Sequence, residues 1–256
     1  MIVQLIRNAT LKIYYHGQVF LTDPVFSSKH VFKSFTGRMR NPLVDLPCSV
    51  LEIMRDVDAV LLSHLHIDHF DVVAEERLSQ EIPIFCQPTD TIRLFEKGFQ
   101  CVTAVEDELI WEGIKITRTT GEHGTGDWSK KMGEVSGFVF QAENEPTIYW
   151  AGDTILCDAV ISVINKIQPD IIITHSGGAR FFESGSIIMD DAQTVEVCKI
   201  APKAKIIAVH MEALDHCSIL RADLCALADK EGIEKDRLLV LADGESIEFE
   251  VVGFFG

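Results

Sequence analysis

The stretch Ala59–Phe70, with the sequence AVLLSHLHIDHF, places three histidines and an aspartate directly after an apolar run. The apolar run predicts a short buried strand that ends where the polar cluster begins. Imidazole nitrogens and carboxylate oxygens are preferred ligands of borderline divalent metals such as Zn²⁺. Alternating His64 and His66 can face the same way at the end of a strand, whereas Asp68 and His69 need an irregular turn to point elsewhere. The pattern therefore predicts two neighbouring metal ions rather than a solvated polar loop.

This H-x-H-x-D-H pattern resembles the signature of the metallo-β-lactamase superfamily, whose members add a histidine, an aspartate and a last histidine from later loops. The chain has matching residues in the same order, each after an apolar strand-like run: His123, Asp153 and His210. The resemblance implies an α/β fold, a four-layer αββα sandwich of two mixed β-sheets flanked by helices. It also implies the ligands: His64, His66 and His123 for one metal, Asp68, His69 and His210 for the second, and Asp153 as a bridge.

Other segments resemble two groups within the superfamily, the ascorbate-phosphate lactonases and the N-acylphosphatidylethanolamine phospholipases D. Thr22–Ser27 contains their D-P-x-F-S pattern, so Asp23 is expected either to support the metal ligands or to cap a turn. Asn8 departs from the pattern, because these relatives usually carry histidine there. The pair Gly177-Gly178 also matches the lactonases, and we expect His175 and Arg180 beside it to bind substrate, although His175 could equally support a ligand. His216 is interpreted as a polar loop residue more readily than as a substrate contact.

The composition narrows the class of protein and its partners. The 256 residues are 47% hydrophobic and 24% charged, with a formal net charge of −16. This charge argues against nucleic-acid and anionic membrane partners, since both bind through many Lys and Arg side chains. The N-terminal sequence lacks the features of a secretory signal, and the cysteines are scattered without a C-x-x-C pair. We therefore expect a cytoplasmic protein with reduced, mostly buried thiols and a small-molecule substrate, and its oligomeric state stays open.

One domain over residues 1–256 is expected, because no linker, repeat or low-complexity segment interrupts the chain. Periodicity and capping residues predict helices over 48–55, 71–80, 89–97, 155–167, 190–200 and 218–231, and a last strand over 246–252. Residues 27–47 form a long connection without periodicity, which is either a pocket wall or a solvated loop. Residues 124–132 are interpreted as a polar loop in which Trp128 contacts substrate or anchors the packing.

The resemblance implies a metal-dependent hydrolase with two divalent ions, Zn or Mn, that lower the pKa of a shared water so that it attacks as hydroxide. Asp68 is expected to accept or deliver a proton besides binding metal. The two similar groups differ in chemistry, so the substrate is either a lactone or a phosphate-containing ester. A non-catalytic metal-binding or sensor protein is one alternative. A diiron-type oxidoreductase is another, although such members carry Glu where this chain has His66 and usually append further domains.

Overall fold

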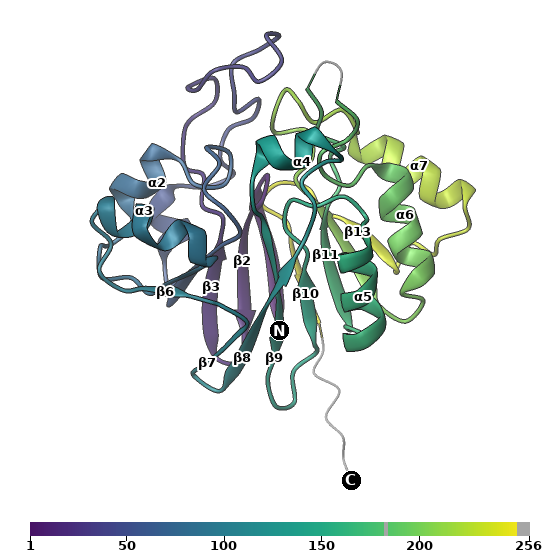
Figure 1. Cartoon of the computed structure of the whole chain (residues 1–256). Coiled ribbons are helices and arrows are strands. Elements are labelled where there is room, and N and C mark those ends of the chain that lie inside the picture. The colour runs from purple at the N-terminus through teal and green to yellow at the C-terminus, as the bar shows by residue number, and fades with distance from the viewer. Residues whose placement is uncertain (182–183, 250–256) are drawn as a thin grey trace.

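The computed structural model describes residues 1–181 and 184–249, which form two facing β-sheets with helices on their outer sides (Figure 1). The first sheet has the strand order β14-β1-β2-β3-β4-β5-β6. Its strands are β1 (Ile2–Arg7), β2 (Thr10–Tyr15), β3 (Gln18–Thr22), β4 (Ala59–Leu62), β5 (Ile84–Cys86), β6 (Val102–Ala104) and β14 (Ser246–Glu248). Pairing is antiparallel from β14 to β3 and parallel from β3 to β6, so the sheet is mixed.

The second sheet has the order β13-β12-β11-β10-β9-β8-β7 and is also mixed. Its strands are β7 (Glu108–Trp111), β8 (Ile114–Thr120), β9 (Ser136–Gln141), β10 (Ile148–Trp150), β11 (Ile171–His175), β12 (Lys205–Val209) and β13 (Leu238–Val240). Strands β10 to β13 are parallel to one another, whereas β7 to β10 are antiparallel. Parallel strands need crossover connections, and here these connections contain the helices.

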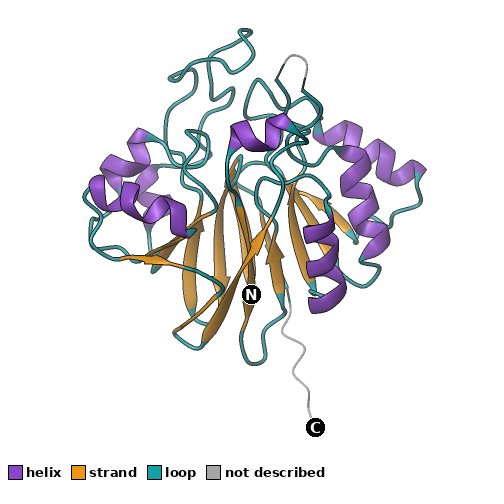
Figure 2. Cartoon of the chain, viewed as in Figure 1, coloured by secondary structure: helices purple, strands orange, loops and turns teal. Residues whose placement is uncertain are grey.

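The helices cover the outer face of each sheet, which gives the four layers seen in Figure 2. The first sheet carries α1 (Val50–Met54), α2 (Val72–Arg77), the 3-10 turn η1 (Pro88–Asp90) and α3 (Thr91–Glu96). The second carries α5 (Asp158–Ile167), α6 (Asp191–Ile200) and α7 (Arg221–Lys230). Separate apolar clusters fill the space between the sheets and the space under each helical layer. The expected sandwich of two mixed sheets flanked by helices is confirmed.

The expected elements differ from the structure mainly at their ends and in one loop. Residues 127–132, expected in a polar loop, form the short helix α4 (Asp127–Met132). The sequence does not predict strands β6 and β7, whose short segments contain only half-buried and exposed residues. The predicted last strand begins at Ser246 as expected, but its residues 250–252 lie outside the described residues. None of the helices in the described ranges is both long and apolar enough to cross a lipid bilayer.

Candidate metal centre

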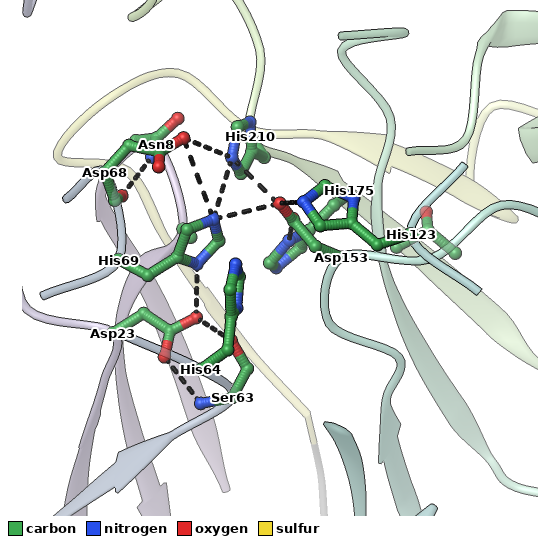
Figure 3. Close-up of polar contacts among 12 residues, drawn as sticks. Asn8, Asp23, Ser63, His64, Asp68, His69, His123, Asp153, His175 and His210 are labelled. Atoms are coloured by element: carbon green, nitrogen blue, oxygen red, sulfur yellow. Dashed lines mark hydrogen bonds and ion pairs between the residues drawn. The ribbon is translucent and has the colours of Figure 1, made fainter. Parts of the chain in front are cut away.

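Four of the predicted ligands follow the carboxyl ends of four different strands, at one edge of the sandwich. His64 follows β4, His123 follows β8, Asp153 follows β10 and His210 follows β12, each within one to three residues of its strand end. Because these strand ends lie side by side, side chains far apart in the sequence converge (Figure 3). The fold therefore assembles the cluster from loops that rigid, buried strands hold in place.

The first group of candidate ligands is His64, His66 and His123, whose ligating atoms all lie within 4.8 Å of one another. The Nε2 atom of His64 lies 2.9 Å from Nδ1 of His66. The other ring nitrogens of two members are tethered: His64 Nδ1 lies 2.9 Å from the Ser63 hydroxyl, and His123 Nδ1 lies 2.8 Å from the Ile187 carbonyl oxygen. Such tethers fix the orientation of an imidazole and leave its second nitrogen for a metal.

The second group is Asp68, His69 and His210, whose ligating atoms also lie within 4.8 Å of one another. The Nε2 atoms of the two histidines are 3.3 Å apart. Oδ2 of Asp68 lies 3.8 Å from Nε2 of His69 and 3.7 Å from Nε2 of His210. On its other side, His210 Nδ1 lies 3.5 Å from the Cys217 thiol. The structure thus brings together the three side chains expected around a second ion.

Asp153 lies between the two groups. Its Oδ2 atom is 3.0 Å from Nε2 of His69 and 3.5 Å from Nε2 of His123. Its Oδ1 atom is 3.7 Å from Nε2 of His210. A carboxylate in this position can share its two oxygens between two cations, which is the bridging arrangement implied by the family resemblance.

Asp23 is fully buried beneath the cluster and contacts one ligand directly. Its Oδ2 atom lies 2.7 Å from Nδ1 of His69 and accepts a 2.6 Å hydrogen bond from the Ser63 hydroxyl, while Oδ1 accepts a 2.8 Å bond from the Ser63 backbone N–H. One carboxylate therefore orients His69 and fixes the first residue after β4. This places Asp23 as a support of the ligands rather than as the cap of its own turn.

Charge provides a test of whether these residues fit a metal. Throughout the described chain, the ion-pair partners of Asp23, Asp68 and Asp153 are all histidines. Burial alone would lower the pKa of His69, but the carboxylates around it outweigh burial and raise its pKa to about 10. Three buried carboxylates thus draw positive charge into the site, and divalent cations would supply it. The donor set fits metal ions.

The net shift is opposite at His64, because burial lowers its pKa and the neighbouring His69 and His66 lower it further. Burial also lowers the pKa of His123, although Asp153 partly opposes the shift. Both imidazoles are therefore held in the neutral form, which is the form that binds a metal. These two members of the first group can therefore bind a cation without having to lose a proton.

Asn8, where the similar groups usually carry histidine, lies beside the second group and links two of its loops. Its side-chain amide donates a 2.9 Å hydrogen bond to the Asp68 backbone carbonyl oxygen, and its backbone carbonyl oxygen accepts a 2.9 Å bond from the His210 backbone N–H. Asn8 has a φ of 60°, a left-handed conformation that asparagine tolerates better than most residues. Its role is to hold these two loops together.

His175, expected either to bind substrate or to support a ligand, lies next to Asp153 and not in the lining of the cavity. Its side chain is fully buried behind the cluster, and both ring nitrogens are engaged. Nδ1 lies 2.5 Å from Oδ1 of Asp153, and Nε2 accepts a 3.0 Å hydrogen bond from the indole N–H of Trp150. His175 therefore orients Asp153, which is the alternative that the sequence left open. The sequence could not separate the two roles because both require a histidine at the end of a strand.

A cavity of about 180 Å³ opens onto the metal centre. Its polar lining comes from the candidate ligands together with His216, which is only 5% exposed and lies 3.7 Å from Asp68 through Nε2 and Oδ2. The rest of the lining is apolar: Phe35, Ile67, Met132, Phe181 and Ile187. No local sequence pattern marks these apolar residues, because they meet only in the folded chain. His216, interpreted as a polar loop residue, instead faces the cavity.

Arg180, expected beside the substrate, does not line this cavity. Its exposed guanidinium bonds to the Ser186 hydroxyl at 3.1 Å, and the next residue, Phe181, faces the cavity instead. The neighbouring glycine pair also has a structural reason, since a Cβ on Gly177 would lie 2.1 Å from the His210 carbonyl oxygen. Trp128 stacks on Phe181 with ring centroids 5.8 Å apart and is a packing anchor of the wall.

Comparison with known proteins bears directly on this geometry. Residues 18–211 match the model of the beta-lactamase superfamily domain, and the match includes His64, His66, Asp153 and His210. The chain belongs to the metallo-β-lactamase superfamily. The UPF0173 protein YddR of Bacillus subtilis is 40% identical over 250 residues, which cover 95% of this chain and 98% of that protein. This superfamily member is thus similar to YddR over nearly its whole length.

Two further relatives differ in what their names state. The N-acyl-phosphatidylethanolamine-hydrolyzing phospholipase D 1 of Caenorhabditis elegans is 29% identical over 228 residues, which cover 79% of this chain and 61% of that protein. The crystal structure of an isothiocyanate hydrolase from Delia radicum gut bacteria is 34% identical, has a TM-score of 0.93, and is matched over 97% of this chain and 99% of that one. By its similarity to these relatives, the superfamily member described here is a metal-dependent hydrolase. Its His/Asp cluster is suited to a metal.

Proposed function

We propose that this hydrolase acts on small, uncharged, apolar electrophiles, and that an organic isothiocyanate is the leading candidate. The observation that carries the proposal is the cavity: five apolar side chains line it, and the described residues of the lining include no lysine or arginine. Its volume of about 180 Å³ lies below the roughly 300 to 1,000 Å³ of drug-sized ligand sites, which favours a small substrate. The similarity to an isothiocyanate hydrolase supports the same class.

The two groups of ligands, with Asp153 between them, would hold two divalent ions. When bound, divalent ions lower the pKa of water and polarise an electrophile. The chain's own contribution is the placement of Asp68, whose carboxylate both belongs to the second group and lines the cavity. In that position Asp68 can accept the proton of the attacking water and return it to the leaving group. His216 lies on the cavity side of Asp68, where it can donate a hydrogen bond to the substrate.

The proposed reaction begins with the addition of water across the C=N bond of the isothiocyanate. The water oxygen bonds to the central carbon, the C=N electron pair moves to nitrogen, and nitrogen takes up a proton. The product is a thiocarbamic acid, which releases carbonyl sulfide and leaves the free amine. No net charge has to be bound in the ground state, so an apolar wall beside a polar base suits this substrate.

The sequence predicted two other substrate classes, a lactone or a phosphate-containing ester, and the cavity suits them differently. A lactone is also uncharged and therefore meets the same requirement of the cavity. A phosphate ester would need a cation near its charged group, and Arg180, expected in that role, bonds to Ser186 away from the cavity. The uncharged substrates are therefore favoured over the phosphate ester.

A direct assay tests the proposal. The purified protein, loaded with Zn²⁺ or Mn²⁺, is given benzyl isothiocyanate, a γ-lactone and a phosphodiester, and amine release or ester cleavage is measured. We expect turnover of the isothiocyanate, and we expect Asp68→Asn to lower kcat by about 100-fold or more with its fold intact, in line with the loss of a general base. Turnover of the phosphodiester alone would overturn the proposal. Near-wild-type kcat in a metal-loaded Asp68→Asn variant would remove Asp68 from proton transfer.

Metal analysis tests the two-ion arrangement separately. We expect close to two divalent ions per chain, and Asp153→Ala should lower the occupancy of both sites because one carboxylate lies between the two groups. His123→Ala is the matched comparison, since His123 belongs to the first group alone. Loss of a single ion in Asp153→Ala would contradict a bridge.

A further inference from the structure

The loop of residues 27–47, which the sequence left open as a pocket wall or a solvated loop, is held at both of its ends by Arg7, and one carboxylate holds its middle part. That carboxylate belongs to Asp215, which follows the candidate ligand His210 in the sequence and directly precedes the cavity residue His216. Asp215 accepts hydrogen bonds from the backbone N–H groups of Phe35 (3.0 Å) and Thr36 (3.2 Å). It accepts others from side chains, at 2.6 Å from Thr36, at 2.8 Å from Asn41 and from the hydroxyl of Ser34.

The contact is reciprocal and closes the loop at its base. The side-chain oxygen of Asn41 accepts a 2.9 Å hydrogen bond from the Asp215 backbone N–H. Asn41 also forms an isolated antiparallel bridge with Phe32, with N···O distances of 2.9 and 3.0 Å. Several charge-assisted bonds therefore meet at one carboxylate and hold both arms of the loop, and such bonds are stronger than neutral ones.

This arrangement positions one cavity residue in particular. The Phe35 backbone is held by Asp215, and its ring packs against His216 with centroids 4.7 Å apart and against Phe181 at 6.4 Å. Phe181 in turn lies 5.6 Å from His216, so the three rings form a continuous aromatic wall on one side of the cavity. We call Phe35, Phe181 and His216 the aromatic wall. All three members lie in loops or turns. Among the described residues, Asp215 is the side-chain carboxylate that connects the Phe35 loop to the segment that carries His216.

We propose that Asp215 is a positioning residue that holds Phe35 in the aromatic wall and thereby gives the hydrolase its preference for substrates with an aromatic side group. An aromatic ring gains from edge-to-face and stacked contacts with other rings, which a small aliphatic group cannot make. The preference rests on the proposed function, whereas the clamp itself does not. In the described part of the chain, the hydrogen bonds to the Asp215 carboxylate come from Ser34, Phe35, Thr36 and Asn41 and from none of the candidate ligands, so its loss should change substrate binding without changing the metal content.

Trypsin provides a readout that needs no activity. The loop carries the exposed residues Lys33, Arg38 and Arg40, and a protease cuts an exposed loop faster once the loop opens. We expect Asp215→Ala to be cleaved in this loop about 10-fold faster than the wild type, and Asp215→Asn to be intermediate because it keeps one acceptor oxygen. Asp236→Ala is the matched control, since Asp236 is a surface carboxylate that bonds to Lys205 outside the loop. Phe35→Ala should keep the wild-type cleavage rate because it leaves the clamp in place.

Kinetics with benzyl and methyl isothiocyanate test the second half of the proposal. We expect Asp215→Ala and Phe35→Ala to raise KM for the benzyl compound by about 10-fold, with kcat and metal content unchanged, and to leave KM for the methyl compound within about threefold. Equal cleavage of Asp215→Ala and wild type, or an unchanged preference for the benzyl compound, would overturn the inference. If the wild type hydrolyses neither compound, the proposed function fails, and the trypsin comparison still decides whether Asp215 holds the loop.

Discussion

At the scale of single residues, the site depends on side chains that orient other side chains. Asp23 holds His69, His175 holds Asp153, and Asn8 bonds to the backbones of Asp68 and His210. Each of these residues is buried, and each fixes a direction that a free side chain would not keep. The sequence specifies the chemical types of the ligands, but the orientation of their side chains depends on these partners.

Replacing Asp23 with Ala should lower metal affinity without removing a ligand. The substitution frees Nδ1 of His69 and leaves Ser63 without its acceptor, so the imidazole loses its fixed orientation. Loss of such a partner typically reduces metal affinity by about 10- to 100-fold. Competition with a chelator measures the change. Asp58→Ala serves as the control, because Asp58 also accepts a backbone hydrogen bond, from Val19, but lies before β4. Equal metal retention in both variants would show that Asp23 does not act through His69.

The seven cysteines should separate into reactive and protected thiols. Burial disfavours the charged thiolate and raises the pKa of Cys86 and of Cys198 to about 11, whereas Cys101 and Cys225 are exposed. At pH 8 the thiols of Cys86 and Cys198 are therefore protonated as well as buried. Because their pKa is higher in the folded state, the folded protein loses stability as these thiols ionise on a rise of pH toward 11. Iodoacetamide labelling followed by mass spectrometry should modify Cys101 and Cys225 first. Early labelling of Cys86 in the folded protein would contradict this order.

At the scale of elements, the site forms because several strands end at the same edge and the chain turns sharply after them. The turn after β10 shows the constraint: Gly152 has a φ of 68°, and a Cβ there would lie 2.4 Å from the Ser136 carbonyl oxygen. Only glycine fits both the left-handed conformation and the close approach of β9. The next residue is Asp153, so this turn decides where the shared carboxylate points.

Gly152→Ala should therefore destabilise the protein and disturb the metal centre together. We expect a loss of about 2 to 4 kcal/mol in the free energy of unfolding, from backbone strain combined with a steric clash. Urea unfolding measures the loss, and metal analysis reports the displacement of Asp153. Gly185→Ala is the comparison, because Gly185 has open space around its Cβ position and no positive φ. A similar stability for both variants would mean that the turn after β10 adjusts easily.

At the scale of the whole molecule, the metal centre joins the two sheets. Asp23 and the residues after β4 belong to the first sheet, whereas Asp153 and His210 follow strands of the second. The carboxylates among them are buried, their ion-pair partners in the described chain are all histidines, and the protein as a whole carries a formal net charge of −16. Cations at this junction would offset local repulsion and bind both halves of the sandwich.

Removal of metal should accordingly lower thermal stability. A ligand that binds only the folded state at 100 times its Kd adds about 2.7 kcal/mol, which for a chain of this size corresponds to roughly 5 to 10 °C in Tm. Chelation followed by scanning calorimetry measures the shift, and readdition of Zn²⁺ or Mn²⁺ should reverse it. Asp153→Ala should show a smaller shift on chelation, because it has lost the carboxylate between the two groups. An unchanged Tm in the wild type would show that the junction is stable without cations.

The sequence by itself determined the class of fold and the chemical identity of the centre. The run from Ala59 to His69, with His123, Asp153 and His210 at the ends of later apolar segments, contains the ligand types in order, and local periodicity placed most helices and strands. These features are local, since ligand chemistry and strand or helix periodicity are both carried by neighbouring residues.

Only the tertiary structure decided which residues face the substrate. Phe35, Phe181 and His216 meet in the cavity although the chain separates them widely, and Arg180 turns away from it while its neighbour turns in. His175 became a support of Asp153, and Asp215 became the anchor of a loop, through contacts across the fold. Such roles depend on which side chains converge when two sheets pack, and no pattern within a single segment of the chain encodes that convergence.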